Sequence, residues 1–593
     1  MTQGAEQVLK QYYGYPSFKE GQQQIIESII EGRDTLGIMP TGGGKSVCYQ
    51  IPALLLTGTT IVISPLISLM KDQVDALKKL GIPAAFINSS LDYIEVEERF
   101  FKARRGQYKL LYVAPERLES QRFLALLGSL NISLVAVDEA HCVSHWGHDF
   151  RPSYLSIASM LQELNSRPVV AAFTATATPE VRRDIVGLLR LSDPDVYITG
   201  FDRPNLSFAI IRGENKRDYL QHYIQIHRRQ AGIIYAATRK EVDNLCALLQ
   251  KKGISAGRYH AGLSDQERMD SQEQFLYDDI QVMAATNAFG MGIDKSNVRY
   301  VIHFNMPKSI EAYYQEAGRA GRDGEPGECV LLFSPQDIQI QRFLIEQSTV
   351  APERQANEYH KLQIMIDYCY TSGCLRNYIL NYFGEQIFGD CHRCSTCNDD
   401  RELTDITVVA QKIFSCIIRM RENFGRILVA EVLKGSKSKK VLQFGLDRLP
   451  TYGLLQDMTE KEIVDLINVL IAEGYLSLTE GQYPLLRLTG NAAPVLNGQA
   501  NVFQKVQPRK QAVMADDLLF ERLRMLRKEL SARENVPPYI IFSDSTLHEM
   551  ARSCPADTES LLSVKGVGAA KLDRYGAQFL KVIGDYLQAN KSE

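Results

Sequence analysis

The sequence predicts an α/β protein with two parallel-sheet lobes, followed by three smaller parts. Two series of short, β-branched apolar runs alternate with helical patterns over residues 36–336, as expected for parallel strands covered on both faces. A glycine-rich segment with a lysine follows the first run, at residues 41–46. Four cysteines gather at residues 374–397, after the second series. A chain of 593 residues is too long for one core, and roughly three to five domains are expected.

Composition limits the class of protein without identifying a partner. Hydrophobic residues make up 45% and charged residues 23%, as in soluble globular proteins. No run of 18 apolar residues is present, so no membrane span is expected, and residues 1–6 lack the pattern of a secretory signal. The net charge of −3 neither supports nor excludes a nucleic-acid partner. An odd total of 11 cysteines without a signal predicts a reducing, cytosolic compartment.

The glycine-rich segment has the pattern of a phosphate-binding loop between a strand and a helix. Its glycines let the backbone approach a polyphosphate, and a helix predicted over Val47–Leu56 adds its N-terminal dipole. Lys45 is placed to reach the β- and γ-phosphates, and the Ser46 hydroxyl to ligate Mg²⁺. Met39 stands where the usual pattern begins with glycine, so a plain glycine-rich turn is the alternative. The candidate nucleotide-binding residues are Thr41, Gly42, Gly43, Gly44, Lys45 and Ser46.

A second motif follows the strand predicted over Ser133–Asp138. A carboxylate at a strand end beside a phosphate loop can hold Mg²⁺, which predicts that role for Asp138. Glu139 is then placed to position and deprotonate the attacking water. Alone, this Asp-Glu-Ala-His motif fits helix capping equally well. Together with the loop at Lys45, it predicts a nucleoside-triphosphate hydrolase, and His141 completes the motif.

These motifs together resemble a superfamily 2 helicase core, and residues 141–152 resemble the aromatic-rich loop of the RecQ DNA helicase family. The resemblance implies two RecA-like lobes, a zinc-binding subdomain, a winged helix and a small helical HRDC domain. It also implies ATP- and Mg²⁺-dependent 3′→5′ unwinding of DNA in recombination, repair and replication, with a part in the SOS response. Residues 14–22 resemble the family's adenine-recognition segment, which implies nucleotide contacts from Tyr15, Lys19 and Gln22. The family commonly has arginine, which stacks on adenine, where this chain has Lys19.

Trp146 is the only tryptophan in the chain and is the candidate for coupling DNA binding to hydrolysis. Its neighbours are polar or glycine, which favours a stacking platform for an unpaired base over a core anchor. The run that ends at residues 174–178 matches the helicase motif that couples the nucleotide and DNA sites, although it also reads as an ordinary helix start. The further candidates for DNA binding or coupling are His148, Phe150, Arg151, Thr174 and Thr176.

The second lobe has no glycine-lysine phosphate loop, so no second nucleotide site is expected there. Arg319 and Arg322 lie three residues apart in a predicted helix, where they can share one face. One interpretation is that these two arginines lie on a solvated helix face. The nucleotide loop in the first lobe instead favours arginine fingers that reach the γ-phosphate across a cleft. Residues 288–295 match a further core motif of the family, which implies that Gly290 and Asp294 lie where the lobes meet.

The cysteines of the third part have the spacing of a metal site. Three lie at C-x₂-C-x₂-C spacing and a fourth lies upstream, which predicts a closed tetrahedral zinc site. An iron–sulfur cluster is the chemical alternative, because the spacing suits it as well. The family resemblance also implies a four-cysteine zinc platform after the lobes. The predicted ligands are Cys374, Cys391, Cys394 and Cys397.

The last third predicts two DNA-binding parts. Helices closed by a hairpin near residues 475–489 indicate a winged helix, and Lys437 and Lys439 lie in a lysine-rich stretch that suits phosphate contacts as well as a solvated loop. Tyr483 is placed at the hairpin tip as a possible wedge. The final segment resembles the HRDC domain, with Tyr539 and Lys565 as candidate single-strand contacts. A purely structural helical bundle is the alternative for that segment.

The resemblance covers nearly the whole chain and implies a set of partners. ATP, single-stranded and duplex DNA, single-stranded-DNA-binding protein and topoisomerase are expected, with no membrane, a monomeric state and a cytoplasmic, nucleoid-associated location. An RNA helicase, or a translocase that does not separate strands, is the alternative enzyme, and a DNA-binding scaffold with a decayed ATPase is the non-enzyme alternative. The expected segments are lobe 1 at 1–205, lobe 2 at 206–336, the zinc subdomain at 337–402, the winged helix at 403–500, a linker at 501–515 and HRDC at 516–593.

Overall fold

A computed structural model describes most of the chain in two compact units. One unit comprises Met1–Asp399 with Ile406–Val502, and the other comprises Asp400–Asp405 with Phe503–Glu593. Within the described residues, no helix is long and apolar enough to cross a membrane. The residues described are 2–290, 295–348, 351–399, 401, 403–479, 484–505, 517–534, 541–564, 566–568 and 571–589.

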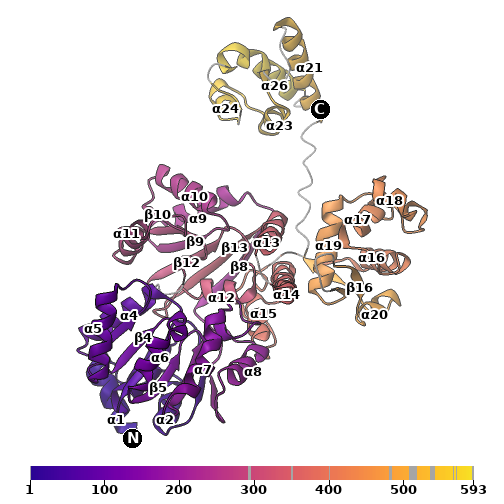
Figure 1. Ribbon diagram of the computed structural model, residues 1–593. Coiled ribbons are helices and arrows are strands. Elements are labelled where there is room, and N and C mark those ends of the chain that lie inside the picture. The colour runs from indigo at the N-terminus through magenta and orange to yellow at the C-terminus, as the bar shows by residue number, and fades with distance from the viewer. Residues whose placement is uncertain are drawn as a thin grey trace. The chain divides into compact units, whose positions relative to one another are not determined.

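Lobe 1 is a seven-stranded parallel sheet with the order β3-β4-β2-β5-β6-β1-β7. Its elements are coloured indigo to purple in Figure 1. Its central strands are buried apolar runs, as a sheet covered on both faces requires. The strands are β1 Thr35–Ile38, β2 Thr59–Ile63, β3 Ala84–Ile87, β4 Leu110–Val113, β5 Ile132–Val137, β6 Val169–Thr174 and β7 Asp195–Ile198. The helices are α1 Thr2–Val8, α2 Gln22–Ile30, α3 Lys45–Leu55, α4 Ile67–Lys79, α5 Tyr93–Arg104, α6 Gln121–Gly128, α7 Ser156–Glu163 and α8 Pro179–Leu188.

Lobe 2 is a six-stranded parallel sheet with the order β10-β11-β9-β12-β13-β8. Side-chain caps start most of its helices, for example Thr238, whose hydroxyl accepts a bond from the Glu241 backbone N–H. The strands are β8 Leu206–Arg212, β9 Ala231–Tyr235, β10 Ala256–Tyr259, β11 Val282–Ala285, β12 Val298–His303 and β13 Gly327–Phe333. The helices are α9 Lys216–Ile226, α10 Arg239–Lys251, α11 Asp265–Leu276 and α12 Ile310–Ala317.

The rest of the first unit contains the zinc-binding subdomain and the winged helix. Helices α13 Pro335–Gln347, α14 Pro352–Tyr370 and α15 Leu375–Tyr382 precede the last three cysteines of the cluster. The winged helix has its own core and an antiparallel hairpin, β15 Leu476–Leu478 with β16 Leu486–Leu488. Its helices are α16 Thr407–Arg419, α17 Arg426–Lys434, α18 Lys439–Gln443, α19 Glu460–Ala472 and α20 Ala492–Leu496.

The second unit combines a short strand pair with a helical bundle. Strands β14 Leu403–Asp405 and β17 Phe503–Lys505 pair antiparallel. A separate apolar core, centred on Leu523, Phe542 and Phe579, holds the helices together. The helices are α21 Asp517–Glu534, α23 Asp544–Ser553, α24 Thr558–Leu562 and α26 Ala577–Ala589.

The predicted fold class is confirmed: two parallel-sheet lobes precede the smaller parts. The strand predicted over Ser133–Asp138 is present as β5, and the hairpin predicted near residues 475–489 is present as β15 and β16. Strands β3, β7, β8 and β10 of the lobes and β14 and β17 of the second unit were not predicted. β7 lies at the sheet edge with an alternating, half-exposed pattern, so it lacks the continuous apolar run of the central strands.

Candidate nucleotide and nucleic-acid site

The glycine-rich loop connects β1 to α3 at the carboxyl edge of lobe 1. β1 is buried between β6 and β7, which fixes where the loop begins. Gly42 and Gly44 have φ values of +82° and +81°, in the left-handed region that favours glycine. Gly44 is the N-cap of α3 and no side chain caps this helix; the Val47 N–H bonds to the Gly44 carbonyl oxygen at 3.1 Å, while the helix dipole still favours an anion at this end. Lys45 begins the helix, and its Nζ donates to the Met39 carbonyl oxygen at 3.4 Å.

The candidate adenine-recognition residues lie against this loop. Gln22 is buried, and its Nε2 donates to the carbonyl oxygens of Gly43 and Gly44 at 3.2 Å each, while its Oε1 accepts the Lys19 backbone N–H at 2.9 Å. Lys19 Nζ donates to the Gly42 carbonyl oxygen at 3.1 Å. In this structure both residues therefore support the loop. Tyr15 is 57% exposed and lines the cavity beside them.

Asp138 and Glu139 follow β5 at the same edge of the sheet. Burial, together with the neighbouring Glu139 charge, raises the pKa of Asp138 to about 7, although Lys45 opposes the shift. Glu139 has φ 46° and ψ 47°, a left-handed conformation that is uncommon for a residue with a Cβ. Its Oε2 is buried and lies 3.4 Å from Nδ1 of His141. Buried carboxylate oxygens without a cationic hydrogen-bond donor suit a bound cation and a water molecule.

A cavity of about 630 Å³ lies between the two lobes and collects the predicted nucleotide residues. Lobe 1 contributes the glycine-rich loop and both carboxylates, while lobe 2 contributes Gln315, Arg319 and Arg322. The stem of Arg322 packs on the loop, since a Cβ added at Gly42 would lie 3.6 Å from its Cγ. Arg319 is buried against Gly290, where an added Cβ would lie 3.2 Å from its Nη2. Asp294 lies outside the described residues.

The prediction that the two arginines share a helix face is wrong. Helix α12 ends at Ala317, and Arg319 and Arg322 lie in the turns that follow it. Gly321 in those turns has a φ of +58°, which no α-helix accommodates. Both side chains still line the cavity, because the turn rather than a helical repeat directs them there.

The aromatic-rich loop connects to the carboxylates through buried polar contacts. His141 Nδ1 lies 2.9 Å from Thr174 Oγ1, and its ring stacks on that of His148 with centroids 4.3 Å apart. His148 Nε2 lies 3.2 Å from Oε1 of Gln315 in lobe 2. Burial lowers the pKa of both histidines, that of His148 to about 3, where the charge of His141 adds to the effect. A continuous path of contacts therefore runs from Glu139 to lobe 2.

Trp146 is 53% exposed, which agrees with its prediction as an accessible platform rather than a core anchor. Its carbonyl oxygen accepts a hydrogen bond from Lys361 Nζ at 2.6 Å, and Lys361 forms a buried ion pair of 2.7 Å with Glu311. Lys361 belongs to α14 and Glu311 to α12, so two elements beyond lobe 1 hold this loop. Neither residue can be recognised from the sequence, since a lone Lys or Glu in a helix carries no distinguishing pattern.

The other candidates of this region are mostly held by protein contacts. Phe150 stacks on His145 at 4.0 Å between centroids. Arg151 donates to the Pro65 carbonyl oxygen at 2.9 Å. Thr174 and Thr176 are buried, and the Thr176 N–H donates to Thr174 Oγ1 at 3.2 Å. The two threonines, like His148, are thus buried within the protein in this arrangement.

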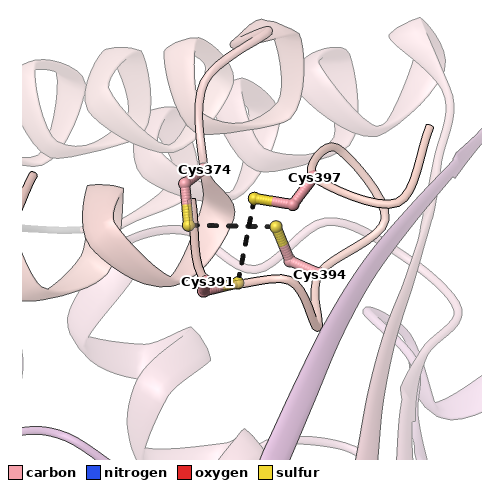
Figure 2. A group of neighbouring side chains, drawn as sticks. All are labelled: Cys374, Cys391, Cys394 and Cys397. Atoms are coloured by element: carbon pink, nitrogen blue, oxygen red, sulfur yellow. Dashed lines mark hydrogen bonds between the residues drawn. The ribbon is translucent and has the colours of Figure 1, made fainter. Parts of the chain in front are cut away.

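The four predicted metal ligands converge in space. Figure 2 shows their sulfur atoms facing a common centre, and all four atoms lie within 4.8 Å of one another. The Cys374–Cys394 and Cys391–Cys397 sulfur separations are both 3.9 Å. Tetrahedral zinc with Zn–S bonds of about 2.3 Å requires sulfur atoms about 3.8 Å apart, so the donor set fits zinc. Bound there, zinc supplies a closed structural crosslink between α15 and the loop that follows it.

The C-terminal candidates are only partly described. Lys437 lies in the loop between α17 and α18, and Lys439 is the first residue of α18; both are exposed. Exposure of lysines beside a short helix agrees with a phosphate-contacting role. Tyr483, Tyr539 and Lys565 lie outside the described residues.

A phosphate loop that faces arginines across the cleft of two parallel-sheet lobes fits an enzyme that hydrolyses a nucleoside triphosphate. Family profiles match the chain in five successive stretches: DEAD/DEAH box helicase at 19–185, helicase conserved C-terminal domain at 215–324, RecQ zinc-binding at 335–398, RQC domain at 400–513 and HRDC domain at 516–583. The chain belongs to the RecQ family of ATP-dependent DNA helicases, as its resemblance predicted.

Relatives that are similar over nearly the whole of this chain support this assignment. The chain is 51% identical to the ATP-dependent DNA helicase RecQ of Bacillus subtilis (strain 168) over 99% of both chains. It is 41% identical to the enzyme of the same name from Pasteurella multocida (strain Pm70), over 98% of this chain and 94% of that one. The RecQ-like DNA helicase BLM of Xenopus laevis is 35% identical over 97% of this chain and 46% of its own length.

Proposed function

We propose that this DNA helicase moves 3′→5′ along single-stranded DNA and separates duplexes by coupling ATP hydrolysis to closure of its two lobes. The observation that carries the proposal is the shared cavity: the glycine-rich loop and carboxylates of lobe 1 and the arginines of lobe 2 line it together. A group needed for hydrolysis thus comes from each lobe, so lobe closure completes the site. The polarity and the pathways of recombination, repair and replication rest on the family resemblance.

The glycine-rich loop binds the nucleotide in this proposal. N–H groups at the α3 N-terminus and the Lys45 ammonium group bind the phosphates, while Tyr15 lies where it can stack on the base. Asp138 and Ser46 are the residues that would hold Mg²⁺ with ATP, because both line the cavity beside the glycine-rich loop. Mg²⁺, when bound, neutralises phosphate charge.

Glu139 is the proposed general base. Its buried Oε2 is placed at the cavity beside the proposed phosphate site, where it orients a water molecule and accepts its proton. The attacking oxygen then forms the new bond to the γ-phosphorus as the bond to the ADP oxygen breaks. Arg319 and Arg322 stabilise the charge that develops on the transferred phosphoryl group.

Trp146 is the proposed sensor of DNA. An exposed indole in a loop held by Lys361 can stack on an unpaired base, and a base stack is worth about 1–3 kcal/mol. The stacked histidine rings join that loop to Glu139 and to Gln315 of lobe 2. DNA occupancy thereby favours one arrangement of the carboxylates and the lobes.

The remaining parts are proposed to hold the duplex and the trailing strand. Lys437 and Lys439 of the winged helix contact duplex phosphates, Tyr483 separates the first base pair, and Tyr539 and Lys565 of HRDC contact single strands. The boundaries expected from the sequence for the lobes, the zinc subdomain, the winged helix, the linker and HRDC are part of this proposal. A monomeric state, a nucleoid location, and single-stranded-DNA-binding protein and topoisomerase as partners rest on the family resemblance alone.

Unwinding of tailed duplexes tests the proposal. The purified protein with ATP and Mg²⁺ is given duplexes with a 3′ tail, a 5′ tail or an RNA tail, and strand separation is followed by fluorescence. We expect unwinding of the 3′-tailed DNA only. Glu139→Gln is the matched control, which should bind ATP yet hydrolyse it at least about 10²-fold more slowly. Equal unwinding of both DNA tails, or hydrolysis by Glu139→Gln at the wild-type rate, would contradict the assigned polarity or base.

A further inference from the structure

The segment that joins the two sheets, residues 199–205, carries an arginine that contacts both sides of the nucleotide cavity. Nη1 of Arg203 donates to the carbonyl oxygen of Thr41 at 2.9 Å and to that of Gly318 at 3.2 Å. Its Nη2 donates to the carbonyl oxygens of Ala320 at 3.0 Å and Gly321 at 2.8 Å. All four acceptors are main-chain carbonyls, one in the phosphate loop and three in the turn of the arginine fingers.

On the lobe 2 side, Arg203 supplies the hydrogen-bond donors that a further helical turn would have supplied. Helix α12 ends at Ala317, so the carbonyl groups that follow have no partner in a further helical turn. A guanidinium at a helix C-terminus satisfies such carbonyls and complements the helix dipole. Arg203 thereby fixes the backbone that leads from Arg319 to Arg322.

On the lobe 1 side, the contact fixes one peptide of the phosphate loop. The carbonyl of Thr41 and the N–H of Gly42 belong to the same planar trans peptide and point in opposite directions. Holding the Thr41 oxygen therefore sets the direction of the Gly42 N–H. Because one guanidinium bonds to both sides, its planar fork also sets the distance between the phosphate loop and the arginine turn.

The zinc-binding subdomain holds the backbone on either side of Arg203. The Phe201 N–H donates to Glu385 Oε1 at 2.5 Å. Arg376, two residues after the first zinc ligand, pairs with Asp202, with Nε 2.7 Å from Oδ1. Arg393, beside another ligand, donates to the carbonyl oxygen of Pro204. These contacts hold the segment around Arg203, so a change in the distance between Thr41 and the turn must be taken up by the Arg203 side chain.

We propose that Arg203 is a positioning residue for ATP hydrolysis, which aligns the arginine fingers with the phosphate loop when the lobes close. The inference rests on the proposed function, because it requires that Arg319 and Arg322 act on the phosphoryl group. Opening the lobes separates Thr41 from the turn, so Arg203 must then release one side. Its bonds therefore form completely only in the closed arrangement.

The chain offers a matched control two residues away. Asn205 Nδ2 donates to the carbonyl oxygens of Gly321 and Glu325 at 2.8 Å each. It thus holds the same turn from the same segment, but none of its described hydrogen bonds reaches lobe 1. Asn205→Ala weakens the turn, whereas Arg203→Gln also breaks the link between the lobes.

The test compares ATP hydrolysis with and without single-stranded DNA in the full-length wild type, Arg203→Gln, Arg203→Lys and Asn205→Ala, together with thermal melting. For Arg203→Gln we expect DNA-stimulated kcat to fall at least about 10-fold with the KM for ATP within about 3-fold of wild type, the pattern of a lost transition-state interaction. Arg203→Lys should not restore kcat, because a lysine keeps the charge but lacks the fork. Asn205→Ala should keep kcat within about 3-fold of wild type, as expected for a contact outside the transition state.

Two results would overturn the inference. One is a kcat for Arg203→Gln equal to that of Asn205→Ala at matched melting temperature; the other is full recovery of kcat by Arg203→Lys. If Arg203→Gln does not fold, Arg203→Lys alone decides by the same comparison with Asn205→Ala. If the wild-type protein itself shows no DNA-stimulated hydrolysis, the proposed function is wrong as well. Failure of the proposed function is thereby distinguished from failure of the Arg203 inference alone, in which the wild type remains active.

Discussion

The sheets of lobe 1 and lobe 2 have the same strand order once the edge strand β7 is set aside. The order β3-β4-β2-β5-β6-β1 of lobe 1 corresponds position by position to β10-β11-β9-β12-β13-β8 of lobe 2. The phosphate loop follows β1, so its counterpart is the connection that follows β8, residues 213–215. There Asn215 caps α9 with its side chain, in place of a glycine-rich turn. One architecture therefore supports two different loops, and the loops decide the chemistry.

A lysine begins the helix after each of these loops, yet the two side chains have different partners. Lys45 begins α3 and faces the cavity, where the described part of the chain gives it no ion pair. Lys216 begins α9 and forms an ion pair of 2.7 Å with buried Asp337, and it donates to the Phe304 carbonyl oxygen at 2.7 Å. A carboxylate of the protein thus satisfies the lysine in lobe 2, whereas the lysine in lobe 1 has only the Met39 carbonyl oxygen, at 3.4 Å, among its described hydrogen bonds.

The ends of the corresponding strands β5 and β12 show the same contrast. Asp138 follows β5 with its pKa raised to about 7, because burial leaves its charge poorly compensated. Asn305 follows β12 and is fully engaged: its Nδ2 donates to Asp337 at 3.1 Å and its Oδ1 accepts the Ala237 N–H at 2.9 Å. A site whose polar groups are satisfied within the protein is stable without ligand, while a site with unsatisfied groups gains most from binding.

The largest effect is expected from replacing Lys45 or Lys216, and the two replacements should differ in what they abolish. Lys45→Ala should abolish ATP hydrolysis with little change in stability, because no other side chain supplies its charge at the phosphates. Lys216→Ala should retain ATP binding but lose about 3–5 kcal/mol of stability, because it leaves Asp337 buried without its cation. Hydrolysis assays and thermal melting of both variants measure this. Loss of ATP binding by Lys216→Ala at full stability would contradict the assignment of Lys45 to ligand binding and of Lys216 to stability.

Removal of zinc should affect both lobes together, since the zinc subdomain holds the segment that joins them. We expect one zinc per chain by elemental analysis, and Cys394→Ser should lower soluble yield, because structural zinc contributes to folding. The Cys416→Ser variant, at a buried cysteine of the winged helix, is the control that keeps its zinc. A well-folded wild type without metal, or one that contains iron, would contradict the assignment.

The sequence predicted what depends on local pattern. The glycine-rich loop, the carboxylates after β5 and the cysteine spacing each lie within a short segment, and the structure brings each group together as expected. The helix assigned to Arg319 and Arg322 is absent because Gly321 there has a φ of +58°, and the carbonyl groups of the resulting turn bond to Arg203, 115 residues from Gly318 and 118 from Gly321.

The contacts that hold the Trp146 loop could not be predicted from the sequence either, because they join residues far apart in the chain. Lys361 reaches the Trp146 carbonyl over a separation of 215 residues. Nothing near Lys361 distinguishes it from a solvated helix lysine until that contact is known. Arg203 was more accessible to prediction, since it lies in the polar Asp-Arg-Pro-Asn stretch at the expected boundary between the lobes.

Trp146→Ala should retain much of its basal ATP hydrolysis and lose stimulation by single-stranded DNA. A lost base stack of about 1–3 kcal/mol corresponds to roughly a 5- to 150-fold weaker response to DNA. Trp146→Phe is the control, because it keeps an aromatic face and should retain part of the stimulation. Melting temperatures of both variants are measured in parallel with DNA-stimulated hydrolysis. A strongly lowered melting temperature with an unchanged stimulation ratio would instead make Trp146 a core anchor.

The smallest effect concerns the stacked histidines, whose charge state is fixed by burial. The pKa of His148 is lowered from 6.5 to about 3 by burial and by His141, and the charges of Glu311, Lys361 and Asp149 also act on it. The unfolded chain therefore binds a proton below about pH 6.5 that the folded protein does not bind, so stability falls as the pH falls from there toward 3. The loss at pH 5.5 is about 1 kcal/mol. His148→Gln removes this titration, so its stability should change less than that of wild type between pH 7.5 and 5.5. Urea unfolding followed by the emission of Trp146, in the same loop, measures the difference, and parallel pH profiles for the two proteins would show that His148 is charged in the folded state.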